Sequence, residues 1–483
     1  MGSRNILFPI FGGILLALSF PPFPLFLLAW VALVPVLVTL TECNLRQAFG
    51  RGYLFLFAFG LINFFWLAQF VSRWTNSILL GTVPYLLVCA AFAVYGGVWA
   101  MASAKAMERK AFWAIPLIWA GVEVLRSGIP YLAFPWALLG TSVTPITTFL
   151  QPAWWGGIYF LSAVLCLFNV FVLRLGMKAE MRETKIYFIF LLGIFAGSIF
   201  SYLYEIPGEK RVLVAAQPAV DLAFSDSQTQ RKLLKERIPL VLRIGSSSRI
   251  DLVVLPEGIS YAIDNEPPRA PFSLDFTVPA ILGGQRKTSE GTYQSLFAFD
   301  GKWQYADKTR LVIFGEYVPF RKQLPFLVPL FRLPTGDLIP ATQVTTLQVG
   351  GIRVGGMICF EVLFEEVARK HLENGAQVLV VPSMDDWYQG TGAIGHLRAV
   401  AIVRAAENRV PVVRSAPTGP SLVVDDRGNV VSETEVGKPS IARGEVVIHP
   451  PLVSPLRKWF PYLALAFWIF FLLIPRRSTL PNR

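Results

Sequence analysis

Eight long apolar runs constrain the fold of this chain more than any other feature of its sequence. A bilayer core about 30 Å thick takes roughly 20 apolar residues of helix, so each run is a candidate transmembrane span. Seven runs precede a polar block and one follows it: residues 6–20, 24–40, 52–70, 78–101, 111–124, 155–173, 186–204 and 459–474. Only 16% of residues are charged, against about 25% in soluble domains, which excludes a disordered or ordinary water-soluble protein.

Charged residues divide the chain into three blocks. Residues 1–209 hold 12 Lys and Arg against 7 acidic residues, 210–458 hold 29 against 25, and 459–483 hold 3 against none. Only the middle block has the near balance of a soluble domain. We therefore expect a transmembrane domain of seven spans at 1–209, a soluble domain at 210–458, and a C-terminal span with a tail at 459–483. Most of the net charge of +12 lies outside the middle block, which argues against nucleic acid as a partner.

The basic residues of the short loops predict the orientation, because cytoplasmic loops are enriched in Lys and Arg. Two of them, Arg73 and Arg126, fall on one side of the predicted membrane. Thirteen fall on the other: Arg4, Arg46, Arg51, Lys105, Arg109, Lys110, Arg174, Lys178, Arg182, Lys185, Arg476, Arg477 and Arg483. Both termini are therefore expected in the cytoplasm, and the middle block is expected in the periplasm or an equivalent exterior.

The middle block has the pattern of a layered α/β domain, because short β-rich runs alternate with helical ones. The expected strands are residues 211–216, 251–255, 280–283, 293–299, 352–358, 377–381, 410–414 and 421–424. The expected helices are residues 227–242, 361–374 and 395–408. Cys359 is the only cysteine of this block, so it has no partner for an internal disulfide. A small buried hydrophobe is the ordinary role of such a residue.

Polar side chains at the ends of these runs suggest a catalytic set. Glu257 ends one apolar run, Cys359 ends another just before a helix, and Lys308 lies between them in the sequence. Glu257 is suited to act as general base, Cys359 as a nucleophile that holds an acyl group as a thioester, and Lys308 with the Phe360 N–H as oxyanion donors. A helix N-terminus would favour the thiolate. An isolated Glu or Lys is far more often a solvated surface group, so only the combination carries weight.

The three motifs in this order resemble the nitrilase superfamily, whose members use a Glu, Lys, Cys triad, over residues 212–447. Together with the spans, the whole chain is similar to the apolipoprotein N-acyltransferase family. Further likenesses are ALSFPPF at 17–23, FPWALLG at 134–140 and LVIFGEYVP at 311–319. The fold that this implies is a membrane α-helical bundle of about eight spans with an exported nitrilase-like α-β-β-α sandwich.

The resemblance implies acyl transfer at the bacterial inner membrane. Cys359 would take an acyl chain from a membrane phospholipid and pass it to the α-amino group of the S-diacylglyceryl cysteine of an apolipoprotein. Glu316 would align Lys308 or the incoming amine, while Phe360 and Glu361 would line the site. The sequence departs from the family pattern at Phe360, where Tyr is frequent, at residues 383–387 (SMDDW) and at 417–419 (PTG).

Several alternatives remain open from the sequence. A membrane-tethered amidase would use the same triad, and an inactive nitrilase-like scaffold would need none of it. We expect no cofactor and no metal, since His371, His396 and His449 lack the spacing of zinc ligands. A monomer is expected. In the membrane block, Glu123 and Arg126 are interpreted as a local ion pair, whereas Trp136, Trp154 and Trp155 are either lipid guides or interfacial anchors.

Overall fold

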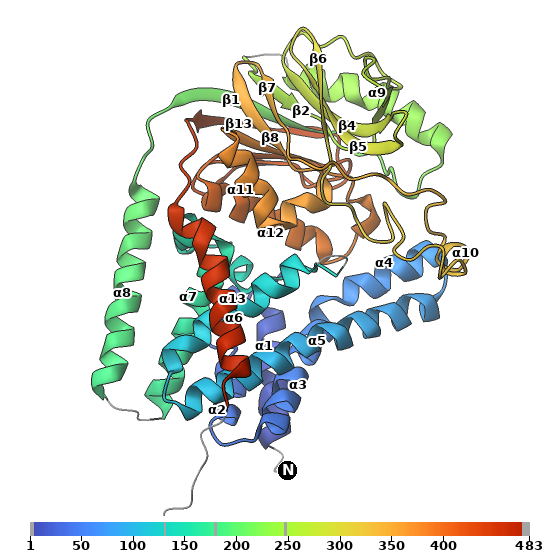
Figure 1. Cartoon of the computed structure of the whole chain (residues 1–483). Helices are drawn as coiled ribbons and strands as arrows, with labels where there is room; N and C mark the ends of the chain where they lie inside the picture. The colour runs from blue at the N-terminus through green and yellow to red at the C-terminus, as the bar shows by residue number, and fades with distance from the viewer. Residues whose placement is uncertain (1–3, 130–131, 178–180, 246–248, 476–483) are drawn as a thin grey trace, which may run out of the picture. The chain divides into compact units, whose positions relative to one another are not determined.

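The computed structural model describes residues 4–129, 132–177, 181–245 and 249–475 (Figure 1). Four basic residues used for the orientation, Lys178, Arg476, Arg477 and Arg483, lie outside this range. The chain forms two compact units, one of Met1–Leu203 with Ser454–Arg483 and one of Tyr204–Val453. Each is described by itself.

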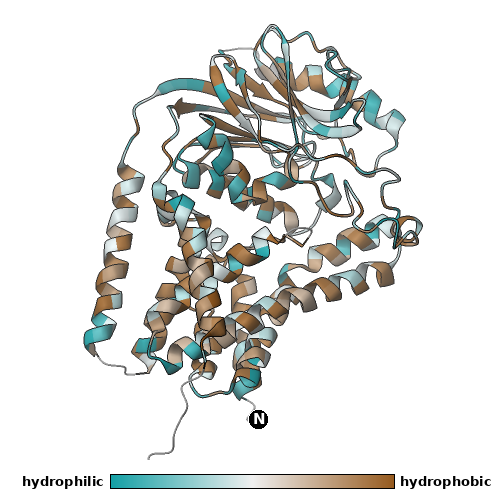
Figure 2. Ribbon diagram, in the orientation of Figure 1, coloured by the Kyte–Doolittle hydropathy of each residue, from teal (hydrophilic) through white to brown (hydrophobic). Residues whose placement is uncertain are grey.

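The first unit is helical, and hydrophobic residues dominate its helices (Figure 2). Its helices are α1 (Arg4–Leu18), α2 (Val34–Leu40), α3 (Leu45–Asn63), α4 (Phe65–Thr75), α5 (Ile78–Glu108), α6 (Ile115–Gly128), α7 (Pro152–Gly176), α8 (Met181–Leu203) and α13 (Pro455–Leu473). Short 3-10 helices connect them: η1 (Phe26–Trp30), η2 (Phe112–Ala114), η3 (Leu139–Val143) and η4 (Thr147–Leu150).

Within the described residues, four helices are long and apolar enough to cross a membrane: α5, α7, α8 and α13. The run predicted as one span at residues 52–70 is divided, because α3 and α4 meet at a bend of 48°. Counted as one broken span, this pair gives a fifth. The predicted number of eight is therefore not confirmed, and the apolar helices α1 and α6 are shorter than a usual span.

A glycine contact brings α3 and α5 close together. A methyl group on Gly52 would lie 2.1 Å from the carbonyl oxygen of Gly96, and one on Gly96 would lie 2.2 Å from that of Gly52. Both clashes are with backbone, which cannot rotate away. Small residues are frequent where membrane helices approach closely, because van der Waals packing drives their association. The two glycines therefore allow these helix backbones to touch.

The second unit contains two β-sheets. One has the strand order β13-β1-β2-β4-β5-β6 with β3 paired to β4, and the other has the order β12-β11-β10-β9-β8-β7. The strands of the first sheet are β1 (Glu209–Gln217), β2 (Leu252–Val254), β3 (Ser260–Ile263), β4 (Ala280–Lys287), β5 (Thr292–Phe299), β6 (Trp303–Asp307) and β13 (Ser440–Ile448). Those of the second are β7 (Thr346–Val349), β8 (Ile352–Gly356), β9 (Val378–Pro382), β10 (Val412–Ser415), β11 (Leu422–Val424) and β12 (Val430–Glu433).

The two sheets pack face to face between helices. Along β1, Leu213 and Ala215 join a core shared with the second sheet, whereas Val214 and Ala216 join a core on the outer face with α9 (Ser227–Gly245). This alternation follows from the two-residue repeat of a strand. The helices α11 (Glu365–Glu373) and α12 (Ala393–Asn408) contact the second sheet. The predicted α/β domain is confirmed, with its layers in the order α-β-β-α (Figure 1).

Among the residues that the structure describes, all eight predicted strands are present together with five others. The additional strands are β3, β6, β7, β12 and β13, which have less regular apolar runs. One predicted helix is wrong at its start. Residues 361–363 belong to a separate 3-10 helix, η5 (Cys359–Leu363), and α11 begins only at Glu365 because Phe364 is extended.

The contact between Gly52 and Gly96 can be tested by adding one methyl group. We expect Gly96→Ala to destabilise the protein by about 1–3 kcal/mol, the usual cost of overpacking, as a lower melting temperature in detergent. Gly50→Ala is the matched control, because Gly50 lies on α3 with nothing within 4 Å of the added methyl. Equal losses in both variants would contradict the close contact.

Candidate functional site

The three residues of the predicted triad come together in the second unit. Glu257 follows β2, Lys308 follows β6 and Cys359 follows β8. Their exposed fractions are only 4%, 1% and 9%. Glu257 lies close enough to Cys359 for its charge to raise the pKa of the thiol, and the Lys308 charge acts on both. An acid, an ammonium and a thiol therefore occupy one desolvated site.

Lys308 is held by a second carboxylate. Its Nζ donates a hydrogen bond of 2.7 Å to Glu316 Oε1, and Glu316 Oε2 accepts the Val312 N–H at 2.7 Å. The turn that carries Glu316 thus fixes the ammonium in place. Burial alone would lower the pKa of Lys308, but the carboxylates of Glu316 and Glu257 raise it overall. Lys308 consequently remains a cation in the site.

Burial has the opposite effect on the acid. Burial raises the pKa of Glu257. The Lys308 charge lowers this pKa, the Glu316 charge raises it, and the resulting pKa is about 7. A carboxylate with this pKa is a stronger base than an ordinary glutamate, so it is suited to accept a thiol proton near neutral pH. Gln294 Nε2 donates a hydrogen bond of 2.7 Å to Glu257 Oε1 and orients the carboxylate.

The nucleophile lies in a tight turn. Cys359 has a φ of +52°, in the left-handed region that non-glycine residues rarely adopt, and it begins the 3-10 helix η5. The longer helix expected after Cys359 begins later, since α11 starts beyond Phe364. Burial raises the pKa of Cys359 and the nearby Glu257 raises it further, while Lys308 lowers it. Cys359 therefore rests as a thiol that needs a base.

Glu361 connects two turns of the site. Its Oε1 accepts the N–H groups of Thr309 and Arg310 at 2.8 and 3.0 Å, and its Oε2 accepts the Ile358 N–H at 2.9 Å. The carboxylate thus ties the segment after Lys308 to the segment before Cys359. The resemblance placed it in the lining of the site, whereas these bonds make it a link between backbone segments. Phe360 is half-buried, and its ring packs edge-on against Phe364.

Three contributors were missed by the sequence reasoning. Besides Gln294, the backbone of Met384 hydrogen-bonds Cys359 and lowers its pKa. Tyr388 lies close enough for the Cys359 and Lys308 charges to affect its pKa, which burial raises. Gln294 had a detectable signal, because it is a polar residue in a strand that is otherwise mostly apolar. The backbone of Met384 had none, since every residue except proline supplies an N–H.

The polar pair of the first unit holds a loop. Arg126 donates hydrogen bonds to the carbonyl oxygens of Phe134 and Trp136, both at 2.7 Å, and Glu123 accepts the Leu139 N–H at 2.8 Å. The two side chains lie 3.8 Å apart, as the interpretation of a local pair requires. Trp136 is buried, with its ring centroid 4.7 Å from that of Trp66, so it fills the core of this unit.

Within the described ranges, no group of three His, Cys, Asp or Glu side chains is arranged to hold a metal ion. The chemistry that the geometry supports is nucleophilic: a base, a thiol and a cation meet at one point. Such a set attacks a carbonyl carbon and stabilises the oxyanion that results.

The raised pKa of Glu257 predicts how the thiol reacts with a small electrophile. The base form of Glu257 prevails above about pH 7, so alkylation of Cys359 by iodoacetamide should accelerate through a midpoint near 7. Glu257→Gln should remove this rise of the rate with pH and should slow alkylation at pH 8 about 100-fold. Mass spectrometry of the Cys359 peptide gives the rate. Glu433→Gln, at a partly exposed ion pair, is the control, and a profile unchanged in Glu257→Gln would contradict the assignment.

Two family models match separate parts of the chain. The apolipoprotein N-acyltransferase N-terminal domain matches residues 12–171, and carbon-nitrogen hydrolase matches residues 275–447. The second range contains Lys308, Glu316 and Cys359, whereas Glu257 precedes it. The matches thus fall on both compact units.

The chain is also similar to individual relatives and to a solved structure. An apolipoprotein N-acyltransferase of Geobacter metallireducens is 29% identical over 467 residues, covering 92% of this chain and 89% of the relative. That of Allorhizobium ampelinum is 29% identical over 478 residues, covering 89% and 88%. The structure of Saccharomyces cerevisiae Nit3, of branch 10 of the nitrilase superfamily, is 19% identical and covers 57% of this chain and 99% of that chain, with a TM-score of 0.38.

Coverage of about nine-tenths of the chain means that these two relatives align with both units and not with the hydrolase part alone. Their alignments and the two family models therefore point to the same assignment. Over most of its length the chain is similar to these apolipoprotein N-acyltransferases.

Proposed function

We propose that this bacterial membrane protein is an apolipoprotein N-acyltransferase that carries its acyl group on Cys359. The observation that carries the proposal is the burial of Glu257 and Cys359 beside the Lys308 cation, in a chain whose other unit matches the acyltransferase N-terminal domain. The acyl donor is a membrane phospholipid. The acceptor is the N-terminal S-diacylglyceryl cysteine of an apolipoprotein.

In the first step, Cys359 Sγ attacks the carbonyl carbon of an acyl ester and its proton passes to Glu257. The oxyanion is stabilised by Lys308 Nζ and the Phe360 N–H. The acyl C–O bond then breaks, and the leaving lysophospholipid oxygen takes the proton from Glu257. The product is a thioester on Cys359.

In the second step, the neutral α-amino group of the lipopeptide attacks the thioester carbonyl. Glu257 accepts the proton that the amine loses, the C–S bond breaks, and the thiolate of Cys359 recovers the proton. An amide bond has formed and the enzyme is restored. Glu316 keeps the Lys308 ammonium in position through both steps, as its 2.7 Å hydrogen bond indicates.

The proposal places the catalytic domain, residues 210–458, in the periplasm or an equivalent exterior. The transmembrane spans lie within residues 1–209 and 459–483, and both termini lie in the cytoplasm. The distribution of Lys and Arg among the short loops supports this orientation. Exterior placement suits the chemistry, because translocated lipoproteins present their N-terminal cysteine on that side. We propose that the protein acts as a monomer.

A second candidate function has one observation in its favour. The carbon-nitrogen hydrolase model matches residues 275–447, so a membrane-tethered amidase with the same residues is the alternative. The two differ in the group that resolves the thioester. An amine acceptor completes the transferase reaction, whereas water completes the hydrolase reaction.

Mass spectrometry can follow the acyl group directly. Purified protein incubated with phospholipid in detergent should gain one acyl adduct on Cys359, and a diacylglyceryl peptide should discharge it as an N-acyl product. Cys359→Ala should give no adduct, and Lys308→Met should form it at least 100-fold more slowly. Cys43→Ala is the control, because Cys43 belongs to the other unit.

The same experiment contains the outcomes that would reject the proposal. If wild-type protein forms no adduct, or if Cys359→Ala forms it undiminished, the proposed nucleophile is wrong. If the adduct turns over in water at the same rate with and without the peptide, the hydrolase is the better description.

A further inference from the structure

One turn contacts both the base and the nucleophile. It follows β9 and spans residues 383–386, the last of which begins the short 3-10 helix η6 (Asp386–Tyr388). The Ser383 carbonyl oxygen accepts the Glu257 N–H at 3.3 Å, while the backbone of Met384 hydrogen-bonds Cys359. Glu257 and Cys359 follow strands of different sheets. The turn is therefore a physical link between two catalytic groups that the sheets alone do not connect.

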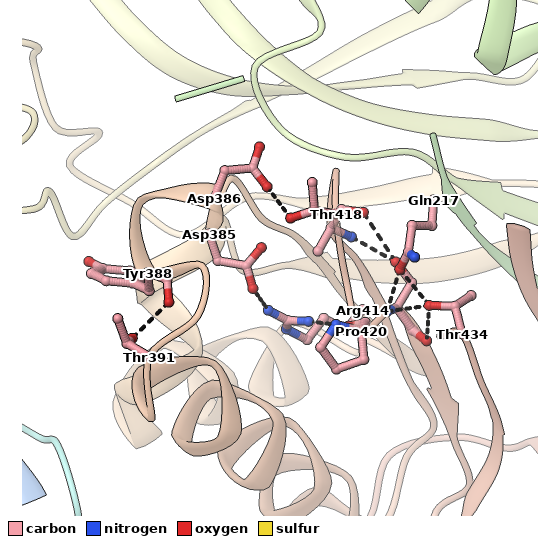
Figure 3. A network of polar contacts seen from close by, with 11 residues as sticks. Gln217, Asp385, Asp386, Tyr388, Thr391, Arg414, Thr418, Pro420 and Thr434 are labelled. Carbon is pink, nitrogen blue, oxygen red and sulfur yellow. Dashed lines mark hydrogen bonds and ion pairs between the residues drawn. The ribbon is translucent and has the colours of Figure 1, made fainter. Parts of the chain in front are cut away.

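Asp385 and Asp386, the last two residues of this turn, anchor it. Figure 3 shows the contacts of their side chains with Arg414 and Thr418. Asp385 accepts a hydrogen bond from the guanidinium of Arg414, on β10, and the two side chains are 1% and 0% exposed. The same guanidinium donates to the carbonyl oxygen of Pro420. Asp386 accepts the Leu222 N–H at 2.8 Å and the hydroxyl of Thr418. The turn is thus fixed to surrounding loops by buried carboxylates.

Stability is a weak reason to keep a buried ion pair. Desolvation of the two charges offsets most of their attraction, and well-packed apolar residues often serve as well or better. A guanidinium does differ from an apolar residue in directing its partner, because its planar donors fix the orientation of a carboxylate. The directional contact between Arg414 and Asp385 lies next to Met384 in the chain. It is therefore suited to keep the Met384 N–H in place beside the Cys359 sulfur.

The pair also has an electrostatic effect. The Asp385 carboxylate acts on Cys359 and raises the thiol pKa, as Glu257 does, while Lys308 lowers it. Removing the Asp385 charge would therefore make Cys359 more acidic if charge were all that mattered. Loss of the Met384 contact would change the reactivity in the opposite direction. The sign of the change separates the two effects.

We propose that Asp385 and Arg414 are positioning residues of the acyl-transfer site, because their buried pair sets the 383–386 turn that places the Met384 N–H on the Cys359 sulfur and the Ser383 carbonyl on the Glu257 backbone. The inference rests on the proposed function for its reaction. Neither side chain is proposed to touch the substrate. Both act on the rate through the backbone of the turn.

Alkylation of Cys359 by iodoacetamide tests this without any lipid. Asp385→Asn should slow alkylation of the folded protein at least fivefold at pH 8, although it removes a negative charge near the thiol. Arg414→Lys keeps both charges but loses the planar fork, and it should slow alkylation at least threefold. Asp426→Asn is the matched control, because it also removes an aspartate charge that faces a buried arginine, Arg409, elsewhere in this unit. Its alkylation rate should stay within twofold of that of the wild type.

The outcomes are distinct. Wild-type or faster alkylation in Arg414→Lys overturns the inference, and so does the same result in Asp385→Asn. If Asp385→Asn does not fold, Arg414→Lys decides alone, with folding checked by its melting temperature. Phospholipid acylation of wild type is measured in parallel. Its failure would reject the proposed function, while the alkylation rates would still report whether the pair positions the nucleophile.

Discussion

The site depends on one buried cation. Lys308 is almost wholly removed from water, and an isolated ammonium in such a place would be very costly. Glu316 compensates it directly, and Glu257 does so through the field between them. Because the same burial raises the pKa of Glu257, the cation and the base exist as one electrostatic unit. The proposed chemistry of Cys359 depends on that unit, because burial raises the pKa of its thiol and Lys308 lowers it.

The fold explains how these charges come to share one point. Glu257, Lys308 and Cys359 each follow a strand, and the strands belong to two sheets packed face to face. Polar links then join the turns across the sheets. Glu361 ties the Lys308 segment to the Cys359 segment, and the turn after β9 ties Cys359 to Glu257. The site is therefore held by backbone contacts as much as by side chains.

The proposed triad could be predicted from sequence because Glu257 and Cys359 each end an apolar run and Lys308 lies between them in the chain. Gln294 and the Met384 backbone were missed for different reasons. Gln294 lies on β5 and donates to Glu257, which follows β2, and a single run does not specify which strands come together. Met384 acts through its N–H, which carries no residue signature. The predicted helix after Cys359 was wrong because Phe364 adopts an extended backbone between η5 and α11, an interruption that helical periodicity did not register.

The sequence by itself determined the apolar blocks and the α/β character of residues 210–458, because both depend on composition or local periodicity. It also predicted Glu257, Lys308 and Cys359 as a set, from their chemical types and their order along the chain. The tertiary structure alone decided that α3 and α4 meet at a bend, that Glu361 is a link between turns, and that Asp385 meets Arg414. These are contacts between segments distant in sequence, or a break within one apolar run. They depend on how sheets and helices pack, and local sequence patterns do not encode that packing.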